Sequence, residues 1–187
     1  MITPAQVSAI QASLKELQLD GWLLYDFRAV NPVTGRVLGV GGMGSRRLFV
    51  LIPREGQATA VAHKIELQPV SGFPGQVRPY AKWEELHQEL GSLVRGKRLA
   101  MEVSPEDAVP YLDRVPAGVV ELIRKLGGTV VPSAPLVSRF AASWSSNGDG
   151  RSFICGGSAG RGGPGRTPLG GRSRTGDSGD RAAGEGG

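Results

Sequence analysis

Apolar residues recur at helical spacing in two parts of the chain. In both parts the intervals are three, four and three residues, over Val7, Ile10, Leu14 and Leu17 and again over Trp83, Leu86, Leu90 and Leu93. That spacing places each set on one face of a helix, which is then expected to be buried. A hydroxyl, a proline and a glutamine in Thr3-Pro4-Ala5-Gln6 form the pattern of a capped helix start. The chain is therefore predicted to form helices over about 4–20 and 82–94.

Short apolar runs bounded by turn residues predict the strands. They are 22–25, 48–52, 58–63, 77–80, 98–103 and 129–131, and a turn at 53–56 joins the second and third as a hairpin. Ser104-Pro105-Glu106-Asp107 has the pattern of another helix start, and a further helix is expected over 117–126. A strand, helices and a strand in succession predict parallel pairing in the second half, whereas the hairpin predicts antiparallel pairing in the first. The fold class is α/β, with a mixed β-sheet flanked by helices.

Residues 27–44 have no periodic pattern and contain Asn31-Pro32 and several glycines. They are predicted to form a long loop with a single helical turn, and such loops in compact domains are usually functional or mobile. Gly39-Val40-Gly41-Gly42-Met43-Gly44 matches a dinucleotide-binding pattern that requires a helix directly after it. Because a strand is predicted there, a glycine hinge is the preferred interpretation.

Glycine is concentrated at one end of the chain. Of 29 glycines in 187 residues, 15 fall within 145–187, which leaves an ordinary globular share for the first 144. We therefore expect one folded domain over 1–144 and a disordered Gly/Arg/Ser-rich tail over 145–187. The loss of lysine and of apolar periodicity in the tail is typical of an out-of-frame reading of a GC-rich gene. The alternative is a genuine disordered tail whose arginines bind RNA weakly, although it offers few aromatic rings for base stacking.

The net charge of +5 divides into +3 for residues 1–144 and +2 for the rest, too little to require a polyanionic partner. The single cysteine, Cys155, forms no disulfide framework and is typical of a reducing compartment. The longest strongly apolar run, 48–52, has only the length of a strand, which argues against a signal peptide or a membrane span. We expect a cytoplasmic protein without a membrane or nucleic-acid partner.

Residue types offer no self-contained catalytic site. His63 and His87 lie 24 positions apart without further ligands at metal-binding spacing, so each is expected at the surface or as a capping group. A Ser-His-Asp or Cys-His set is not apparent either, since Cys155 lies in the predicted tail. We therefore assign no catalytic residue and no metal ligand.

One polar cluster surrounds the end of the first predicted strand and the start of the second. It joins a carboxylate, an amide and three guanidinium groups, from Asp26, Arg28, Asn31, Arg46 and Arg47. In the structural interpretation, a salt bridge from Asp26 to an arginine pins the loop. In the functional interpretation, the arginines and Asp26 meet a charged end of a small ligand, because a guanidinium fork matches a carboxylate.

The same region contributes to a family resemblance that depends on segments taken in order. These are YDFRAVNP (25–32), RRLFVLIPREG (46–56), AMEVSP (100–105), RVPAGVVEL (114–122) and LVSRF (136–140). Together they resemble the N-terminal domain of the creatinase, prolidase and aminopeptidase P family. No single motif among them is diagnostic, so the resemblance depends on the whole set.

This resemblance implies a mixed α/β domain of ribonuclease H-like topology that precedes a separate catalytic domain. In that family the catalytic domain binds two divalent metals, manganese, cobalt or zinc, and cleaves the bond before a proline. The N-terminal domain supplies homodimer contacts and walls the active site. Asp26, Arg28, Asn31, Arg46 and Arg47 thereby become candidates for a substrate-gating wall that selects short proline-containing peptides.

The sequence departs from the family pattern after Trp144. The metal ligands of the family are two aspartates, a histidine and two glutamates, and the segments that carry them do not follow. A frameshifted or truncated peptidase gene is the leading hypothesis for this boundary. We therefore expect an isolated, non-catalytic N-terminal domain of an Xaa-Pro dipeptidase or aminopeptidase, with no cofactor of its own and no peptidase activity. The alternative is a standalone module that binds a small charged ligand or a partner protein.

Overall fold

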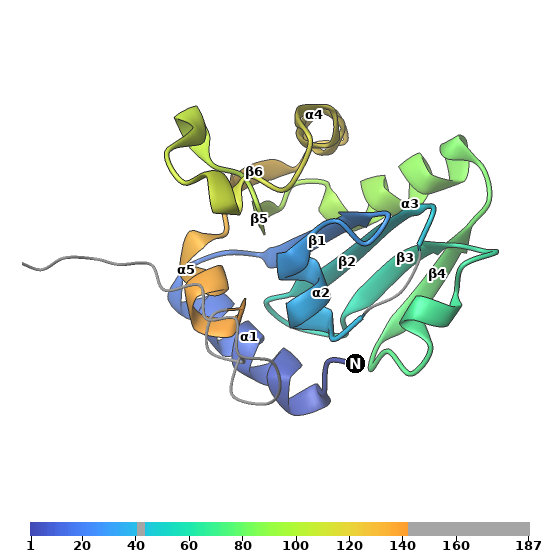
Figure 1. The fold of residues 1–187 in the computed structure, drawn as a ribbon, viewed down its shortest axis with the longest axis horizontal. Helices are drawn as coiled ribbons and strands as arrows, with labels where there is room; N and C mark the ends of the chain where they lie inside the picture. The colour runs from blue at the N-terminus through green and yellow to red at the C-terminus, as the bar shows by residue number, and fades with distance from the viewer. Residues whose placement is uncertain (41–43, 142–187) are drawn as a thin grey trace, which may run out of the picture. The chain divides into compact units, whose positions relative to one another are not determined.

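A computed structural model describes residues 1–40 and 44–141 of the chain. In this part a six-stranded sheet has helices packed on both faces (Figure 1). In spatial order the strands are β4 (Gln76–Tyr80), β3 (Thr59–His63), β2 (Arg47–Pro53), β1 (Gly21–Phe27), β5 (Arg98–Met101) and β6 (Thr129–Pro132). β2 is antiparallel to both of its neighbours, and the other pairs are parallel. All the strands except β2 therefore end at one edge of the sheet, which we call the carboxyl edge.

The two faces of the sheet pack against different helices (Figure 1). One core includes residues of α1 (Pro4–Glu16), α2 (Pro32–Leu38) and α5 (Ala134–Leu136), which a π-helical turn over Val137–Ala141 continues. The other core includes residues of α3 (Trp83–Val94) and α4 (Ala117–Lys125). Successive β1 residues alternate between them, with Trp22 and Leu24 in the first core and Leu23 and Tyr25 in the second. Because both faces are covered, the central strands are almost entirely apolar.

Most of the predicted elements are confirmed. The Thr3–Gln6 capping box forms as expected, since Gln6 N–H donates to Thr3 Oγ1 and Thr3 N–H donates to Gln6 Oε1. α1 ends earlier than predicted, at Glu16, and the chain then turns through Gln18 with φ of 54°. The β2–β3 hairpin and the parallel β5–β6 pair match the expectations for the two halves of the chain.

The prediction for 27–44 is wrong in one respect, because this segment contains the two-turn helix α2 rather than a single turn. Asn31 is its N-cap, and Pro32 occupies the first helical position. Gly39 ends the helix with φ of 60°, a left-handed conformation that glycine adopts without strain. An Asn-Pro pair is typical of a loop, whereas in this position it begins a helix. The glycine-rich pattern is followed by β2, as predicted.

Two further expectations are wrong. β4 pairs parallel with β3, although the first half was expected to be antiparallel. The intervening residues 64–75, with a 3₁₀ turn over Gln68–Val70, form a crossover long enough for parallel pairing. The helix expected to start at Ser104 is absent: residues 105–112 form only 3₁₀ turns, over Pro105–Asp107 and Pro110–Leu112, because Glu106 and Asp107 have φ of 57° and 53°.

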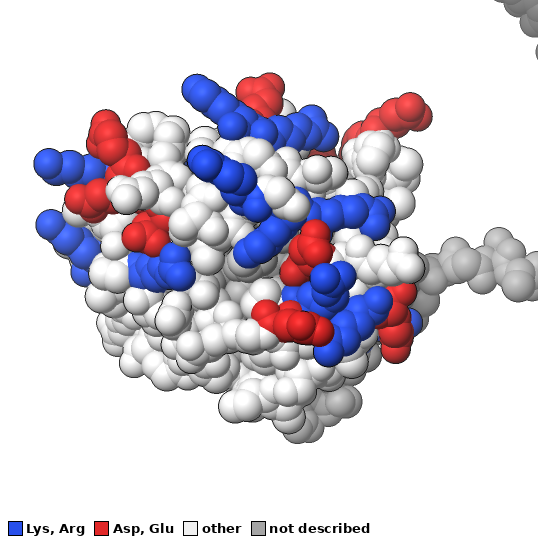
Figure 2. Space-filling view, turned by 180° about the vertical axis from the view of Figure 1, so that it is seen from behind, with Lys and Arg blue, Asp and Glu red and all other residues white. Residues whose placement is uncertain are grey.

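On the face shown in Figure 2, basic and acidic side chains are intermixed and much of the lower part is uncharged. This distribution agrees with the small net charge. No helix within residues 1–40 and 44–141 is long and apolar enough to cross a membrane. The predicted tail, 145–187, lies outside the described residues.

Candidate functional site

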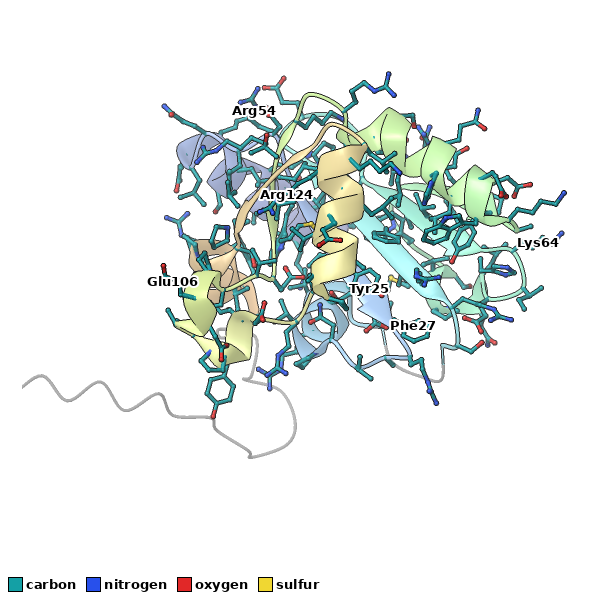
Figure 3. All side chains as sticks on the ribbon, turned by 90° about the horizontal axis from the view of Figure 1, so that it is seen from above. Tyr25, Phe27, Arg54, Lys64, Glu106 and Arg124 are labelled. Atoms are coloured by element: carbon teal, nitrogen blue, oxygen red, sulfur yellow. The ribbon has the colours of Figure 1, made fainter. Side chains whose placement is uncertain are left out.

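A cleft of about 230 Å³ lies at the carboxyl edge, between the end of β1, the start of α2 and β2, and the end of β3. Its polar lining residues are Asp26, Asn31, Arg46, Arg47, His63 and Glu66. The fold therefore brings four members of the predicted cluster to one cavity. The fifth, Arg28, is exposed and does not line the cleft. Figure 3 shows Phe27, at the end of β1, far from Arg54, which lies at the opposite edge of the sheet.

Asp26 pins the loop through the backbone. Its carboxylate oxygens accept hydrogen bonds from Ala29 N–H and Asn31 N–H, both at 2.9 Å. Within the described parts of the chain no arginine lies at salt-bridge distance from Asp26, so the interpretation of an Asp26–arginine bridge is wrong. Between these bonds, Arg28 and Ala29 adopt left-handed φ values of 63° and 56°. Two consecutive non-glycine residues in this region are unusual and store backbone strain at the rim of the cleft.

Asn31 is buried, and all of its amide groups are engaged. Its Oδ1 accepts from Val33 N–H at 3.0 Å and Thr34 N–H at 3.3 Å, which caps α2. Its Nδ2 donates to the carbonyl of Tyr25 at 2.8 Å and to Glu102 Oε2 at 3.3 Å. Asn31 therefore forms the wall of the cleft and leaves no free amide group for a ligand.

Glu66, which the sequence reasoning missed, positions the arginine-bearing strand. Its carboxylate accepts from Ser45 N–H, from Arg46 N–H at 2.9 Å and from the Ser45 hydroxyl. The hydrogen bond from that hydroxyl, aided by the backbone bonds, lowers the pKa of Glu66 below its usual value. Glu66 follows β3 and lies 20 positions after Arg46, so no local pattern in the sequence could have paired them.

Arg47 lies between aromatic rings instead of beside a carboxylate. Its guanidinium carbon is 5.0 Å from the centre of the Trp83 ring and 5.9 Å from that of Phe27. Such contacts hold a guanidinium in place without neutralising it. Arg47 also faces the buried Tyr25. Burial raises the pKa of Tyr25, and the positive charge of Arg47 opposes this rise. Neither Arg46 nor Arg47 has an ion pair within residues 1–40 and 44–141.

Both histidines make contacts within the fold. His63 Nδ1 accepts from Ile65 N–H at 3.3 Å, which leaves its Nε2 to donate to the carbonyl of Ala81 at 3.2 Å. His87 packs against Trp83, with ring centres 4.3 Å apart and the rings tilted by 57°, and its Nε2 is buried without a hydrogen-bond partner in the described structure. No group of three His, Cys, Asp or Glu side chains that could hold a metal occurs among the residues described.

Behind the cleft wall, Glu102 is completely buried at the end of β5. Its carboxyl group accepts hydrogen bonds from Trp22 Nε1 at 2.6 Å, the Ser133 hydroxyl at 3.2 Å and Asn31 Nδ2 at 3.3 Å. Burial raises the pKa of Glu102 to about 7, and the three hydrogen bonds only partly offset that rise. The only signal for this group in the sequence is a glutamate at the end of an apolar strand, which matches no motif.

Solved structures share this fold over most of the described part. The prolidase from Pyrococcus horikoshii OT3 matches 74% of this chain and 35% of its own, with 18% identity and a TM-score of 0.54. A recombinant prolidase from Thermococcus sibiricus has the same identity and a TM-score of 0.57, over 74% of this chain and 36% of its own. The creatinase/prolidase N-terminal domain of an X-Pro dipeptidase from Streptococcus pyogenes aligns over 73% of this chain and 99% of its own, with 15% identity and a TM-score of 0.56.

These likenesses confirm the predicted fold class: residues 1–40 and 44–141 have the fold of the creatinase/prolidase N-terminal domain. The chain spans about a third of the length of the two prolidases. No protein-family model matches the sequence, and no curated protein matches it significantly.

Proposed function

We propose that residues 1–144 are the non-catalytic N-terminal domain of an Xaa-Pro dipeptidase or a related metallopeptidase, in which they dimerise and wall a substrate cleft. One observation supports this most directly: the described fold aligns with nearly the whole of an isolated creatinase/prolidase N-terminal domain. The parent enzyme would hold two divalent metals, manganese, cobalt or zinc, in a separate domain. A cytoplasmic location remains part of the same proposal.

The balance of charge in the cleft favours a ligand that carries a carboxylate. Asp26 and Glu66 already accept two and three hydrogen bonds from neighbouring groups. The guanidinium groups of Arg46 and Arg47 form no ion pair with a carboxylate in the described structure, so their side-chain N–H groups can bind an anion. A short proline-containing peptide with a free C-terminus provides such a group.

A titration of the ¹⁵N-labelled 187-residue chain with an Xaa-Pro dipeptide tests the ligand. We expect the backbone amide chemical shifts of Ala29, Arg46 and Arg47 to change as the dipeptide is added. The same dipeptide with an amidated C-terminus should bind about tenfold more weakly, because it loses a charged hydrogen bond. Arg46→Gln is expected to weaken binding by a similar factor. Arg124→Gln, on α4 away from the cleft, is the matched control and should leave binding unchanged (Figure 3). Equal binding of acid and amide would contradict the proposed carboxylate recognition.

Peptidase activity is not expected from the purified 187-residue chain. Two-metal hydrolysis needs carboxylates and a histidine around a shared cavity. The measurement is cleavage of an Xaa-Pro dipeptide with added manganese, cobalt or zinc, followed by release of proline. Cleavage above a metal-only control would overturn the non-catalytic assignment.

Analytical ultracentrifugation tests the proposed dimer separately. Sedimentation of the chain as a monomer at tens of micromolar would overturn the dimer and leave the non-catalytic assignment unaffected.

A further inference from the structure

Asn31 is the layer between the cleft and the buried carboxyl group of Glu102. It lines the cleft, and its Nδ2 donates to Glu102 Oε2. On either side of it the chain is open to solvent, because Val30 and Pro32 are exposed while Asn31 itself is 3% exposed. Water that enters past Asn31 would therefore reach Glu102 from the cleft.

The neighbours of Glu102 carry no charge. They are Trp22 from β1, Asn31 at the start of α2 and Ser133 from the turn before α5. Its main-chain carbonyl accepts from the N–H groups of Arg114 and Val115, and the Arg114 guanidinium turns away to the carbonyl of Tyr111. Burial and hydrogen bonds alone therefore set the pKa of Glu102, and no cation in the described structure compensates its ionised form.

Asn31 also determines where α2 begins. The amide that donates to Glu102 accepts from Val33 N–H and Thr34 N–H through its oxygen. Thr34 Oγ1 and Asn31 Nδ2 both donate to the carbonyl of Tyr25, which ties the helix to the end of β1. The next turn of α2 contributes Gly35 to the cleft lining. A rearrangement that admits water to Glu102 must therefore loosen the first turn of α2.

We propose that Glu102 is a positioning residue of the cleft, whose ionisation favours an opened state in which Asn31 releases the first turn of α2. The direction follows from linkage: an opened state in which Glu102 is hydrated has the ordinary carboxyl pKa, so it binds fewer protons than the closed state and gains population as pH rises. The closed cleft wall is thus the low-pH form. The effect on ligand binding rests on the proposed function of the cleft, whereas the opening itself does not.

Amide hydrogen exchange at low urea concentrations measures this opening in the full chain. After correction for intrinsic rates, we expect Val33 and Thr34 to exchange up to about 30-fold faster at pH 8.5 than at pH 5.5, the limit set by pKa values of 4.5 and about 7. This exchange should be independent of urea, as for a local opening. Val120 and Ile123 of α4 serve as internal controls and should show only the urea-dependent exchange of global unfolding.

Glu102→Gln should remove the pH dependence at Val33 and Thr34, since the amide keeps the shape and does not titrate. Glu121→Gln, an exposed glutamate of α4, is the matched control and should retain it. If Glu102→Gln does not fold, the ¹³C carboxyl shift of Glu102 in the wild type must titrate with the same midpoint as the exchange. A pH effect confined to urea-dependent exchange, or one that survives in Glu102→Gln, would refute the proposal. Failure of a dipeptide to bind would refute the proposed function and leave this inference standing.

Discussion

Among single residues, three polar side chains around the cleft form hydrogen bonds to backbone N–H groups. Asp26 fixes the loop after β1, Glu66 fixes the approach to β2, and Asn31 fixes the start of α2. Satisfying backbone N–H groups in this way is what permits an irregular edge next to a buried sheet. The backbone at Arg46 is therefore held by Glu66, and the Arg47 guanidinium lies near the rings of Phe27 and Trp83.

Glu102 gives the molecule a pH-dependent stability. The folded state holds its proton up to about pH 7, whereas the unfolded chain releases it near 4.5, so the folded state binds more protons within this window. The free energy of unfolding therefore falls as pH rises from 4.5 to 7, by about 3 kcal/mol at most. Urea denaturation at several pH values should show this component in the wild type and not in Glu102→Gln. Parallel stability profiles for the two proteins would show that Glu102 does not titrate in that range.

At the scale of elements, the parallel β3–β4 pair forms the outer part of the sheet beside the cleft. Gly75 lies directly before β4, and a Cβ added to it would lie 2.2 Å from the carbonyl oxygen of Ala58. The same carbonyl accepts from Gln76 N–H at 2.9 Å, the first bond of the β4 register. Close backbone approach, rather than a turn conformation, thus explains the glycine here.

Gly75→Ala should accordingly destabilise the fold by about 1–3 kcal/mol, because the nearest clash is with the Ala58 backbone and a side-chain rotation cannot relieve it; the methyl group would also lie 2.6 Å from Phe73 Cε1. Gly118→Ala is the control: in α4 a Cβ would meet nothing within 4 Å, and alanine favours helix, so stability should be unchanged or slightly higher. Thermal unfolding followed by circular dichroism compares the two variants. Equal melting temperatures would mean that β4 moves to accommodate the methyl group.

At the scale of the whole molecule, one sheet with two separate apolar cores accounts for the described residues. Each core is large and continuous, and the members come from both halves of the sequence. A domain of this size and burial can fold independently. We therefore propose that residues 1–144 are one folding unit, distinct from 145–187 in composition.

Limited trypsin digestion tests this division. All five lysines lie within 1–144, as do most arginines, and six arginines lie within 145–187. We expect rapid cleavage after the arginines of 145–187 and a protected fragment that mass spectrometry places at about residues 1–150, because packed backbone resists cleavage. Early cleavage within β1, β2 or β5 would contradict a folded domain. Stable protection of 145–187 would contradict the predicted disorder.

Elements whose signals are local follow from the amino-acid sequence alone. The spacing in 4–20 and 82–94, the apolar runs of the strands and the capping box all depend on neighbouring residues, and each was predictable from them. The order of these elements sufficed for the fold class. Four of the five members of the polar cluster were predictable as a set, since Asp26 and Asn31 lie at or after the end of β1, and Arg46 and Arg47 lie at the start of its neighbour β2.

Interactions between distant segments become visible only in the folded chain. The parallel direction of β4, the bond from Glu66 to Arg46 and the burial of Glu102 beside Trp22 join residues far apart in sequence. Local patterns carry no information on such contacts, because desolvation and pairing depend on what the folded chain brings near. For the same reason Asp26 bonds to backbone rather than to arginine: once α2 forms, the nearest unsatisfied donors are N–H groups of its own loop.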